Sequence, residues 1–384
     1  YKSTDGGVNW TLVTTGKNGF PNDAGVGRIG LAISHQNSNK IYALLDNQNR
    51  LPAEEKDYAV DKAKLNSISS TDFQKLSDKD INDFLDRHNF PNKYNATDIK
   101  KDVAAGTLKP ADLVSYLADA NAMLFDTPVI GAEVYVSEDG GSNWSKTHDG
   151  YIDDLYYSYG YYFGNIRVAP QDDNKLYILG VPILKSADGG KKWEDINGAN
   201  VHSDHHALWV SDNIDGLLIN GNDGGVNISF DDGESWTKQN TLPVGQFYSV
   251  NVDHDKPYNV YGGLQDNGVW EGPSNYSYSL RWQSRGKYPY QSLYGGDGMQ
   301  VVVDTRDNNL VYTGFQFGYY ARINKKTGKR KSIKPTHSLG EPPLRFNWQS
   351  PIHLSVHNQD VVYFGSNKFH RSLNQGDDWD ITSE

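Results

Sequence analysis

Cysteine is absent from the 384-residue sequence, which excludes disulfide bonds and metal sites built from thiolates. Long apolar runs are missing as well, and none approaches the roughly 20 residues that a membrane-spanning helix requires. The first residues do not have the pattern of a signal peptide. We therefore expect no membrane span and no cysteine-based cofactor site.

Positive charge is also scarce in this chain. It has 37 Lys and Arg against 48 Asp and Glu, which gives a formal net charge of −11 at pH 7. Because a nucleic-acid-binding protein needs a basic face for the phosphates, this balance argues against a nucleic-acid partner.

Glycine and aromatic residues are abundant, with 38 Gly, 25 Tyr, 13 Phe and 9 Trp. Aromatic residues favour strands, whereas Gly, Asn and Asp favour tight turns. Hydrophobic residues make up 37% of the chain, which is enough for a large core. This composition predicts many short strands that are joined by tight turns.

A short motif of the form S-x-D-x-G-x-x-W occurs several times, with Asn374 in place of the Asp in the last copy. Repeated motifs of this kind are the signature of a repeat architecture. The copies are STDGGVNW (3–10), SEDGGSNW (137–144), SADGGKKW (186–193), SFDDGESW (229–236) and SLNQGDDW (372–379).

A second repeat, a strand with a central tyrosine, accompanies the first. Tyr261, Tyr312 and Tyr363 follow one another at equal intervals of 51 residues. A period of this length with about four strands per unit is typical of a β-propeller blade. Within each blade we expect strands A, B and C, then the motif, then strand D. In two blades without the motif, strand C is expected at 268–272 and 319–324.

The spacing of the motifs predicts the domain organisation. Residues 16–384 accommodate six complete blades of an all-β propeller of about seven four-stranded blades. Residues 1–15 have the pattern of the end of a preceding blade, so we expect the chain to be a fragment. The long gap between the first two motifs predicts an α-helical insertion at 48–131, within a B–C loop.

The motif identifies a resemblance to the Asp-box (BNR) repeats of sialidases, sortilin-type receptors and two-propeller xyloglucanases. Five segments are similar to exported bacterial proteins that are called sortilin-like or glycosyl-hydrolase-like, and the helical insertion is typical of Bacteroidetes members. The resemblance implies a secreted or cell-surface protein with a further propeller segment upstream. The five segments are 204–236, 242–253, 258–270, 295–304 and 345–355.

In Asp-box families the motif is a structural hairpin, and the resemblance assigns the same role here. The Asp caps backbone N–H groups of the turn, a Gly adopts positive φ, and the Trp packs between neighbouring blades. We expect structural roles for Asp5, Asp139, Asp188, Asp231, Trp10, Trp144, Trp193, Trp236 and Trp379.

The opposite face, formed by the loops that enter strand A and join strand B to strand C, has unusual polar and aromatic residues. Aromatic rings stack on sugars or peptides, while amides and carboxylates bind polar groups. The predicted ligand-binding residues are Arg28, Tyr161, His202, Asp204, His205, Asn222, Tyr248, Gln265, Asn267, Gln316, Arg345, Asn347 and Trp348.

The segment HSDHH (202–206) is the most distinctive part of this face. Imidazole and carboxylate groups are metal ligands, so His202, Asp204 and His205 are a candidate metal site. His205 and His206 are expected to begin a strand and to point to opposite sides. The alternative is that one histidine is buried and hydrogen-bonded while Asp204 fixes a loop.

Asp223, Asp266 and Asp297 are the candidate catalytic carboxylates of this face. Glycoside hydrolysis needs two carboxylates about 5–9.5 Å apart, one of which has a raised pKa. The alternative is that these residues cap the tight turns between strands. A sialidase needs an arginine triad, and only Arg28 and Arg345 are suitably placed for one.

Within residues 48–131 the apolar spacing of three and four residues predicts helices. Their own core is expected from Phe73, Leu76, Phe84, Leu113, Tyr116 and Leu117. The insertion is either a lid over the ligand-binding face or a packing element against a neighbouring domain.

Two functions remain open on the sequence alone. The first is an exported propeller that recognises a glycan or peptide on the face opposite the Asp-boxes. The alternative is a xyloglucanase-like glycoside hydrolase that uses aspartates of the same face. No cofactor other than the candidate metal ion is expected.

Overall fold

The computed structural model describes residues 1–51, 58–119, 129–239, 244–277, 279 and 288–383. The chain divides into two compact units, each of which contains three four-stranded antiparallel sheets. Unit 1 comprises Tyr1–Ala53 and Met123–Val244, and unit 2 comprises Glu54–Ala122 and Gly245–Glu384. In every sheet the strands follow one another in chain order, as expected for a propeller blade.

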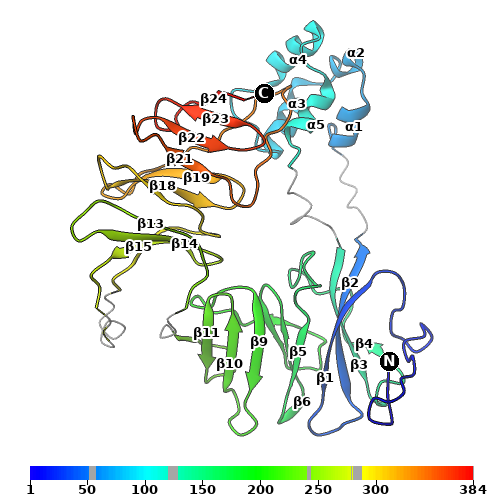
Figure 1. Cartoon of the computed structure of the whole chain (residues 1–384). Coiled ribbons are helices and arrows are strands. Elements are labelled where there is room, and N and C mark those ends of the chain that lie inside the picture. The colour runs from blue at the N-terminus through cyan, green and yellow to red at the C-terminus, as the bar shows by residue number, and fades with distance from the viewer. Residues whose placement is uncertain (52–57, 120–128, 240–243, 278, 280–287, 384) are drawn as a thin grey trace. The chain divides into compact units, whose positions relative to one another are not determined.

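Unit 1 contains the sheets β1–β4, β5–β8 and β9–β12 (Figure 1). Their strands are β1 (Val26–Ile33), β2 (Ile41–Arg50), β3 (Val129–Ser137), β4 (Ser145–Lys146), β5 (Asn165–Ala169), β6 (Asp172–Leu179), β7 (Ile183–Ser186), β8 (Glu194–Asp195), β9 (His205–Val210), β10 (Leu218–Asn222), β11 (Gly225–Ser229) and β12 (Thr237–Gln239).

Unit 2 contains the sheets β13–β16, β17–β20 and β21–β24. Their strands are β13 (Phe247–Val252), β14 (Asn259–Leu264), β15 (Gly268–Pro273), β16 (Gln291–Tyr294), β17 (Val302–Val303), β18 (Leu310–Phe315), β19 (Tyr319–Asn324), β20 (Arg330–Ser332), β21 (Ile352–Leu354), β22 (Val362–Gly365), β23 (Phe369–Ser372) and β24 (Asp380–Ile381). The fold class is therefore all-β, built from propeller blades with a small helical part, as the sequence predicts.

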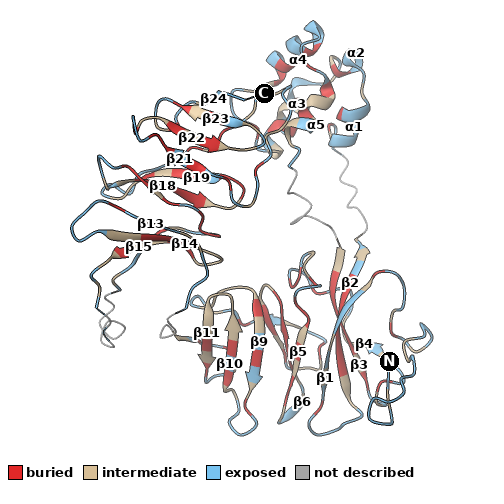
Figure 2. Ribbon diagram, in the orientation of Figure 1, coloured by how far each residue is buried: buried red, intermediate tan, exposed pale blue. Residues whose placement is uncertain are grey.

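The two central strands of the sheets carry much of the core. Leu44 on β2 and Ile178 on β6 have no exposed surface and belong to one apolar cluster of unit 1. In unit 2, Tyr320 and Phe364 meet edge to face at 5.4 Å between ring centroids. Complete burial of one such side chain contributes about 1.5–3 kcal/mol. Figure 2 shows the buried residues concentrated on the central strands of the sheets.

The repeated tyrosine of strand B is part of this core and links neighbouring sheets in unit 1. The hydroxyl of Tyr42 donates to the carbonyl oxygen of Asp173 at 2.9 Å. The hydroxyl of Tyr177 donates to the carboxylate of Asp232 in the next sheet. Burial and the Asp232 hydrogen bond raise the pKa of Tyr177 far above its usual value. The strand-B tyrosine therefore marks a repeated packing position.

The five Asp-box turns share a hydrogen-bond pattern, which the copy at 186–193 illustrates. The hydroxyl of Ser186 donates to Asp188 Oδ1 at 2.9 Å and accepts the N–H of Gly190 at 2.9 Å. Asp188 Oδ1 also accepts the N–H groups of Lys191 and Lys192. In the last copy Asn374 Oδ1 keeps the acceptor role towards the N–H of Asp378 at 2.9 Å.

The tryptophans of the boxes have two arrangements. Where two glycines follow the Asp, the indole N–H donates to the turn's own second glycine, as Trp193 does to Gly190 O. Where Asp232 or Gln375 replaces the first glycine, the indole bonds to the preceding blade instead. Trp236 donates to Ile196 O at 2.8 Å. The expected packing between blades is therefore clearest in the boxes that depart from the double-glycine pattern.

Residues 1–15 contain the first box within a bridge between Lys2 and Thr11. Lys2 Nζ donates to Gly140 O, in the box of the first complete sheet, at 2.7 Å. Trp10 is 61% exposed, unlike the tryptophans of the later boxes.

The helices lie between β2 and β3 in the sequence but belong to unit 2. Side chains of Asp61, Ser69, Ser77 and Asn95 cap the first four, each by accepting a backbone N–H of its helix. The helices are α1 (Lys62–Ser67), α2 (Ser70–Phe73), α3 (Asp78–Arg87), α4 (Ala96–Ala105) and α5 (Pro110–Tyr116).

The helices have a core of their own, which contains the buried side chains of Phe73, Phe84 and Leu113. Leu76, Tyr116 and Leu117 are only partly buried and pack against this core from its edge. No helix in the described part of the chain is long and apolar enough to cross a membrane.

The segment that joins β20 to β21 docks on these helices. Leu339 packs against the helical core, and its N–H donates to the hydroxyl of Tyr94 at 2.9 Å. His337 Nε2 lies 3.3 Å from the carbonyl oxygen of Tyr116. The insertion thus packs against a loop of its own unit, a contact that neither of the two expectations names.

Candidate ligand-binding sites

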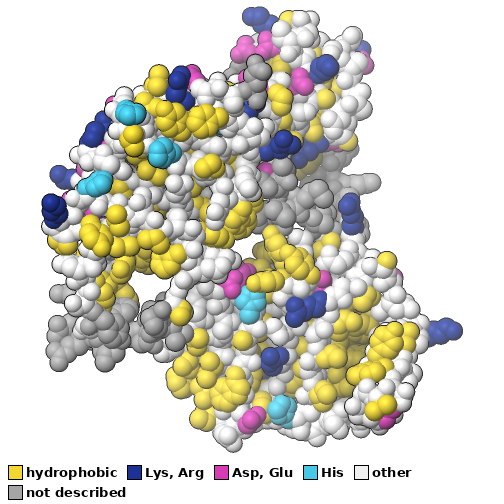
Figure 3. All heavy atoms as spheres, in the orientation of Figure 1, with side chains coloured by type: hydrophobic (Ala, Val, Ile, Leu, Met, Phe, Trp, Pro, Cys, Tyr) yellow, Lys and Arg dark blue, Asp and Glu magenta, His cyan; other side chains and the backbone are white. Residues whose placement is uncertain are grey.

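The first candidate site lies in unit 1, where the connections before β5 and β9 and the β10–β11 turn meet. Arg28 on β1 donates through Nη1 to the carbonyl oxygens of Tyr161 and Tyr162, at 3.2 and 3.1 Å. These contacts leave both tyrosines on the surface, 66% and 57% exposed. Figure 3 shows histidine, acidic, basic and hydrophobic side chains together near the start of β9.

His206 connects these tyrosines to the carboxylates. Its ring meets that of Tyr162 edge to face at 4.9 Å and stacks on Phe163 at 5.3 Å. Its Nε2 is 3.1 Å from Asp223 Oδ1, although the two atoms do not have the angles of a hydrogen bond. The β10–β11 turn thus brings Asp223 against the aromatic part of the site.

Asp204 is the second carboxylate of this site. It has a positive φ of 64°, and its N–H donates to Val181 O at 3.0 Å, which fixes the start of β9. Burial raises the pKa of Asp204, and the nearby charge of Asp223 raises it further. The site therefore contains two interacting carboxylates, one of which keeps its proton to a higher pH than usual.

His205 points away from this site into the protein and has no exposed surface. Its Nδ1 is 2.8 Å from Asn220 Oδ1, and its Nε2 is 2.7 Å from the side-chain amide of Asn197. Burial lowers the pKa of His205 to about 4, so the ring is neutral at pH 7. Because a neutral ring has one N–H, it donates to one of these asparagines and accepts from the amide group of the other.

The three residues predicted to hold a metal are not gathered by the structure. Both nitrogens of His205 are engaged by asparagines, and His202 Nδ1 lies 3.0 Å from the carbonyl oxygen of Ser203. No group of three potential metal-binding side chains occurs in the part of the chain that the structure describes. The arrangement of His205 corresponds to the alternative of a buried, hydrogen-bonded histidine.

Asn222 has a local role beside this site. Its Nδ2 donates to Asn220 and Asn227 at 3.0 Å, and its Oδ1 accepts the N–H of Gly224 at 3.0 Å. These bonds close the β10–β11 turn that carries Asp223.

The second candidate site lies in unit 2 and contains the other two predicted catalytic residues. Asp297 is 8% exposed, and its Oδ1 accepts the N–H of Asp266 at 3.0 Å. The N–H of Asp297 in turn donates to Gln316 Oε1 at 3.3 Å. Asp297 therefore holds the β14–β15 turn, which is the structural alternative considered for it.

Aromatic residues adjoin this carboxylate pair. The indole N–H of Trp348 donates to the hydroxyl of Tyr248 at 3.0 Å, and its ring meets Phe317 edge to face at 5.1 Å. Burial raises the pKa of Tyr248, and the charges of Asp297 and Asp266 raise it further. Tyr248, Trp348 and the two aspartates thus form one cluster.

The remaining predicted residues of unit 2 are held mainly through their backbones. Gln265 O accepts both the N–H and the side-chain Nδ2 of Asn267, at 2.7 and 3.0 Å. The N–H of Arg345 donates to Asn367 Oδ1, Arg345 O accepts the N–H of Asn367, and Asn347 Oδ1 accepts the N–H of Trp348. Arg345 and Asn347 are both exposed residues.

Two residues outside the predicted set have unusual surroundings. Asp46, on β2, is 1% exposed, and burial raises its pKa. An acidic residue within the apolar strand KIYALLD is the sequence signal that points to it. Lys334 lines a cavity of unit 2, and no motif marks it, because its neighbours come from distant segments.

Comparisons with known proteins give no family assignment. No protein-family model matches the sequence, and no curated protein matches it. The Asp-box family therefore stays a resemblance.

Among solved structures, a GH74 enzyme from Niastella koreensis matches 94% of this chain at 12% identity with a TM-score of 0.31. The GH74 xyloglucanase from Xanthomonas campestris matches 92% at 10% identity with a TM-score of 0.29. YCF48 from Cyanidioschyzon merolae matches 67% of this chain and 81% of its own, at 12% identity with a TM-score of 0.25. This chain spans 38% of the length of each of these two GH74 enzymes.

Proposed function

We propose that this chain recognises a glycan at the unit 1 site, through the exposed rings of Tyr161 and Tyr162. The observation that carries the proposal is that the ring of Tyr162 meets His206, which lies beside Asp223, and that the charge of Asp223 acts on Asp204. Tyrosine rings offer flat apolar surfaces to the C–H faces of a sugar, and carboxylates accept hydrogen bonds from its hydroxyl groups. His206 joins the two parts, because it contacts the ring of Tyr162 and lies beside Asp223.

Hydrogen bonding also supports this choice of site. Arg28 fixes the backbone of both tyrosines, so the loop that carries them needs little ordering on binding. In unit 2, by contrast, Asp297 is almost fully buried and its carboxylate serves the turn. Together with the resemblance to exported proteins, a glycan ligand also supports a secreted or cell-surface location.

The test is a binding experiment with the intact chain and a panel of oligosaccharides, which includes xyloglucan and host-type glycans, and a set of peptides. Isothermal titration should detect a glycan whose binding is lost in the double variant Tyr161→Ala, Tyr162→Ala. Tyr258, which is 48% exposed in unit 2, provides the matched control Tyr258→Ala. Binding that survives the double variant, or that is confined to peptides, would contradict the proposal.

A second candidate function, glycoside hydrolysis, is favoured by one observation. The raised pKa of Asp204 beside Asp223 is the arrangement that a general acid and its partner carboxylate need. In this mechanism Asp204 donates the proton to the leaving oxygen, and Asp223 assists as nucleophile or base.

An assay of the reducing ends released from the same glycans distinguishes hydrolysis from binding alone. Hydrolysis predicts that Asp204→Asn abolishes turnover while glycan binding persists. Asp212→Asn, at an exposed position of unit 1, is the control and should leave turnover unchanged. If no glycan that binds is cleaved, the hydrolase function is withdrawn and the binding function stands.

A further inference from the structure

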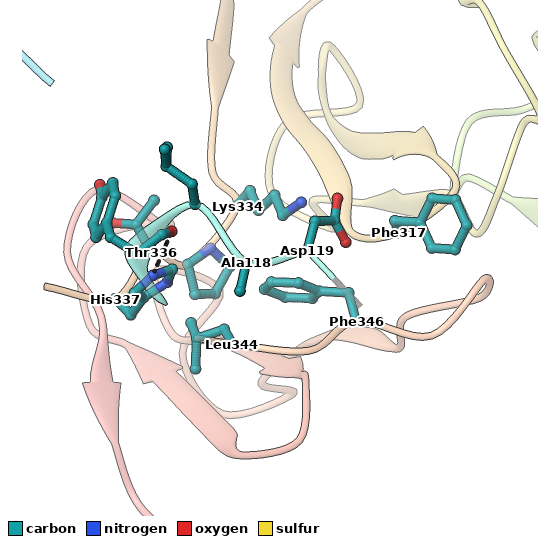
Figure 4. A pocket seen from close by; sticks show the side chains of 11 residues that line it. Ala118, Asp119, Phe317, Lys334, Thr336, His337, Leu344 and Phe346 are labelled. Carbon is teal, nitrogen blue, oxygen red and sulfur yellow. Dashed lines mark hydrogen bonds between the residues drawn. The ribbon is translucent and has the colours of Figure 1, made fainter. Parts of the chain in front are cut away.

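A cavity of about 210 Å³ lies in unit 2 between the end of α5 and the segment that joins β20 to β21 (Figure 4). Its walls include apolar side chains from three separate segments of the chain, namely Leu117, Phe317, Leu344 and Phe346. The charged groups that line it are Lys334 and Asp119. The cavity thus combines an apolar part with one ammonium and one carboxylate group.

Lys334 is held in this cavity by aromatic rings. Its Nζ is 3.5 Å from the ring centroid of Tyr319 and 4.6 Å from that of Phe346. Figure 4 shows its side chain extending towards Asp119 and Phe317, next to the ring of Phe346. Within the described residues, no hydrogen bond or ion pair to Nζ accompanies these ring contacts. Lys334 has intermediate exposure and its Nζ is not fully buried, so the ammonium keeps only part of the hydration that a surface lysine has.

Partial burial disfavours the charged form of this ammonium when no anion is bound. Burial lowers the pKa of Lys334 to about 8, against the opposing influence of Asp119. A bound anion would supply both an acceptor and a countercharge, because charge-assisted hydrogen bonds to lysine are among the strong ones.

We propose that this cavity binds a small carboxylic acid with an apolar body, whose carboxylate pairs with Nζ of Lys334. The apolar part contacts Phe317, Leu344 and Phe346. The volume is adequate, because an apolar cavity of about 150 Å³ holds a benzene molecule. The site belongs to the junction between the helices and the sheets of unit 2, and it shares no residue with the proposed glycan site of unit 1.

Benzoate and its uncharged analogue benzyl alcohol test this proposal on the full chain. Saturation-transfer NMR should detect benzoate, and its signal should disappear in Lys334→Met but remain in Lys334→Arg. Lys331→Met is the matched control, since Lys331 is a more exposed lysine that pairs with Asp377. Melting temperatures of all variants establish that each is folded.

Asp119→Asn gives an independent readout that does not remove the lysine. At about pH 6, where the ammonium of Lys334 stays protonated, loss of this negative charge should tighten benzoate binding by about 1.4- to 5-fold, the range of an exposed ionic interaction. Equal binding of benzyl alcohol, benzoate binding that persists in Lys334→Met, or benzoate binding that weakens in Asp119→Asn would each overturn the proposal.

Discussion

Asp204 shows how one residue of the HSDHH segment acquires a chemical property from its surroundings. Its carboxyl group is partly buried at the start of β9, and the charge of Asp223 acts on it from the β10–β11 turn. Both effects disfavour the ionised form, so its proton persists at a higher pH than that of an exposed aspartate.

We predict that Asp223→Asn lowers the pKa of Asp204, because it removes a like charge. The change is measured by the NMR titration of the Asp204 side-chain carbon in wild type and variant. Asp212→Asn should leave this titration unchanged. A pKa of Asp204 that does not fall in Asp223→Asn would show that the two carboxylates do not interact.

The serine of each Asp-box is as important as the aspartate that names it. Ser186 is 1% exposed, and its hydroxyl is the acceptor for the buried N–H of Gly190. Asp188 is partly exposed, and Asn374 fills the corresponding position of the last box with an equivalent acceptor atom. A neutral amide oxygen is therefore compatible with the turn.

We predict that Ser186→Ala lowers the free energy of unfolding by about 1–3 kcal/mol, the cost of a buried group without a partner. Asp188→Asn should have a smaller effect, because the amide oxygen can still accept the N–H bonds. Guanidinium denaturation provides the measurement. Ser142→Ala, at an exposed serine of another box, serves as the control. A larger loss in Asp188→Asn than in Ser186→Ala would contradict this order.

Elements that the repeats specify locally could be predicted from sequence. The strands expected at 268–272 and 319–324, where the box is missing, are β15 and β19. The opposite orientation of His205 and His206 also follows from strand alternation, but the burial of His205 and the partners of its ring do not. Asn197 and Asn220 reach it from other strands or loops, and no local pattern encodes that meeting.

The docking of the helices could not be predicted, for the same reason. Leu339 and Tyr94 are 245 residues apart, and each looks like an ordinary residue of its own segment. Their contact depends on how two separate elements fold and meet. The cavity around Lys334 was unpredictable because it forms only at this junction.

At the scale of elements, we predict that Tyr94→Phe weakens the docking of the β20–β21 segment. The N–H of Leu339 loses its acceptor, so its hydrogen exchange should become about 2- to 10-fold faster, the equivalent of one hydrogen bond. Mass spectrometry of the peptide that covers 335–341 reports the rate. Tyr58→Phe, at an exposed tyrosine beside Arg87, should leave this peptide unaffected. Unchanged exchange in Tyr94→Phe would argue that this bond does not hold the segment.

At the scale of the whole molecule, the Asp-boxes make the free energy of unfolding depend on pH in the acidic range. Backbone and side-chain hydrogen bonds of Asn9 and Asn143 lower the pKa values of Asp5 and Asp139 to about 2. A carboxylate with a lowered pKa stabilises the fold fully above its unfolded value near 3.8. That contribution is lost as the pH falls through about 2.

We predict that the melting temperature falls between about pH 4 and pH 2, as measured by circular dichroism. The triple variant Asp139→Asn, Asp188→Asn, Asp231→Asn should show a weaker decline over this range, because these three boxes no longer take up protons. Asp46 and Asp204 have raised pKa values, so their protonation favours the folded state and opposes this fall in melting temperature. An equally steep decline in the triple variant would place the acid sensitivity elsewhere.

The position of the helices between β2 and β3 has a consequence for synthesis on the ribosome. β2 ends at Arg50 and its partner β3 begins at Val129. At a synthesis rate of about 5–20 residues per second, the edge of β2 is therefore unpaired for roughly 4–16 s. The helices emerge next, but Leu339, which packs on them, comes 245 residues after Tyr94. Neither compact unit is complete when the first sheet closes. Unit 1 extends to Val244, and the helices of unit 2 stay without their packing segment until Leu339 is made.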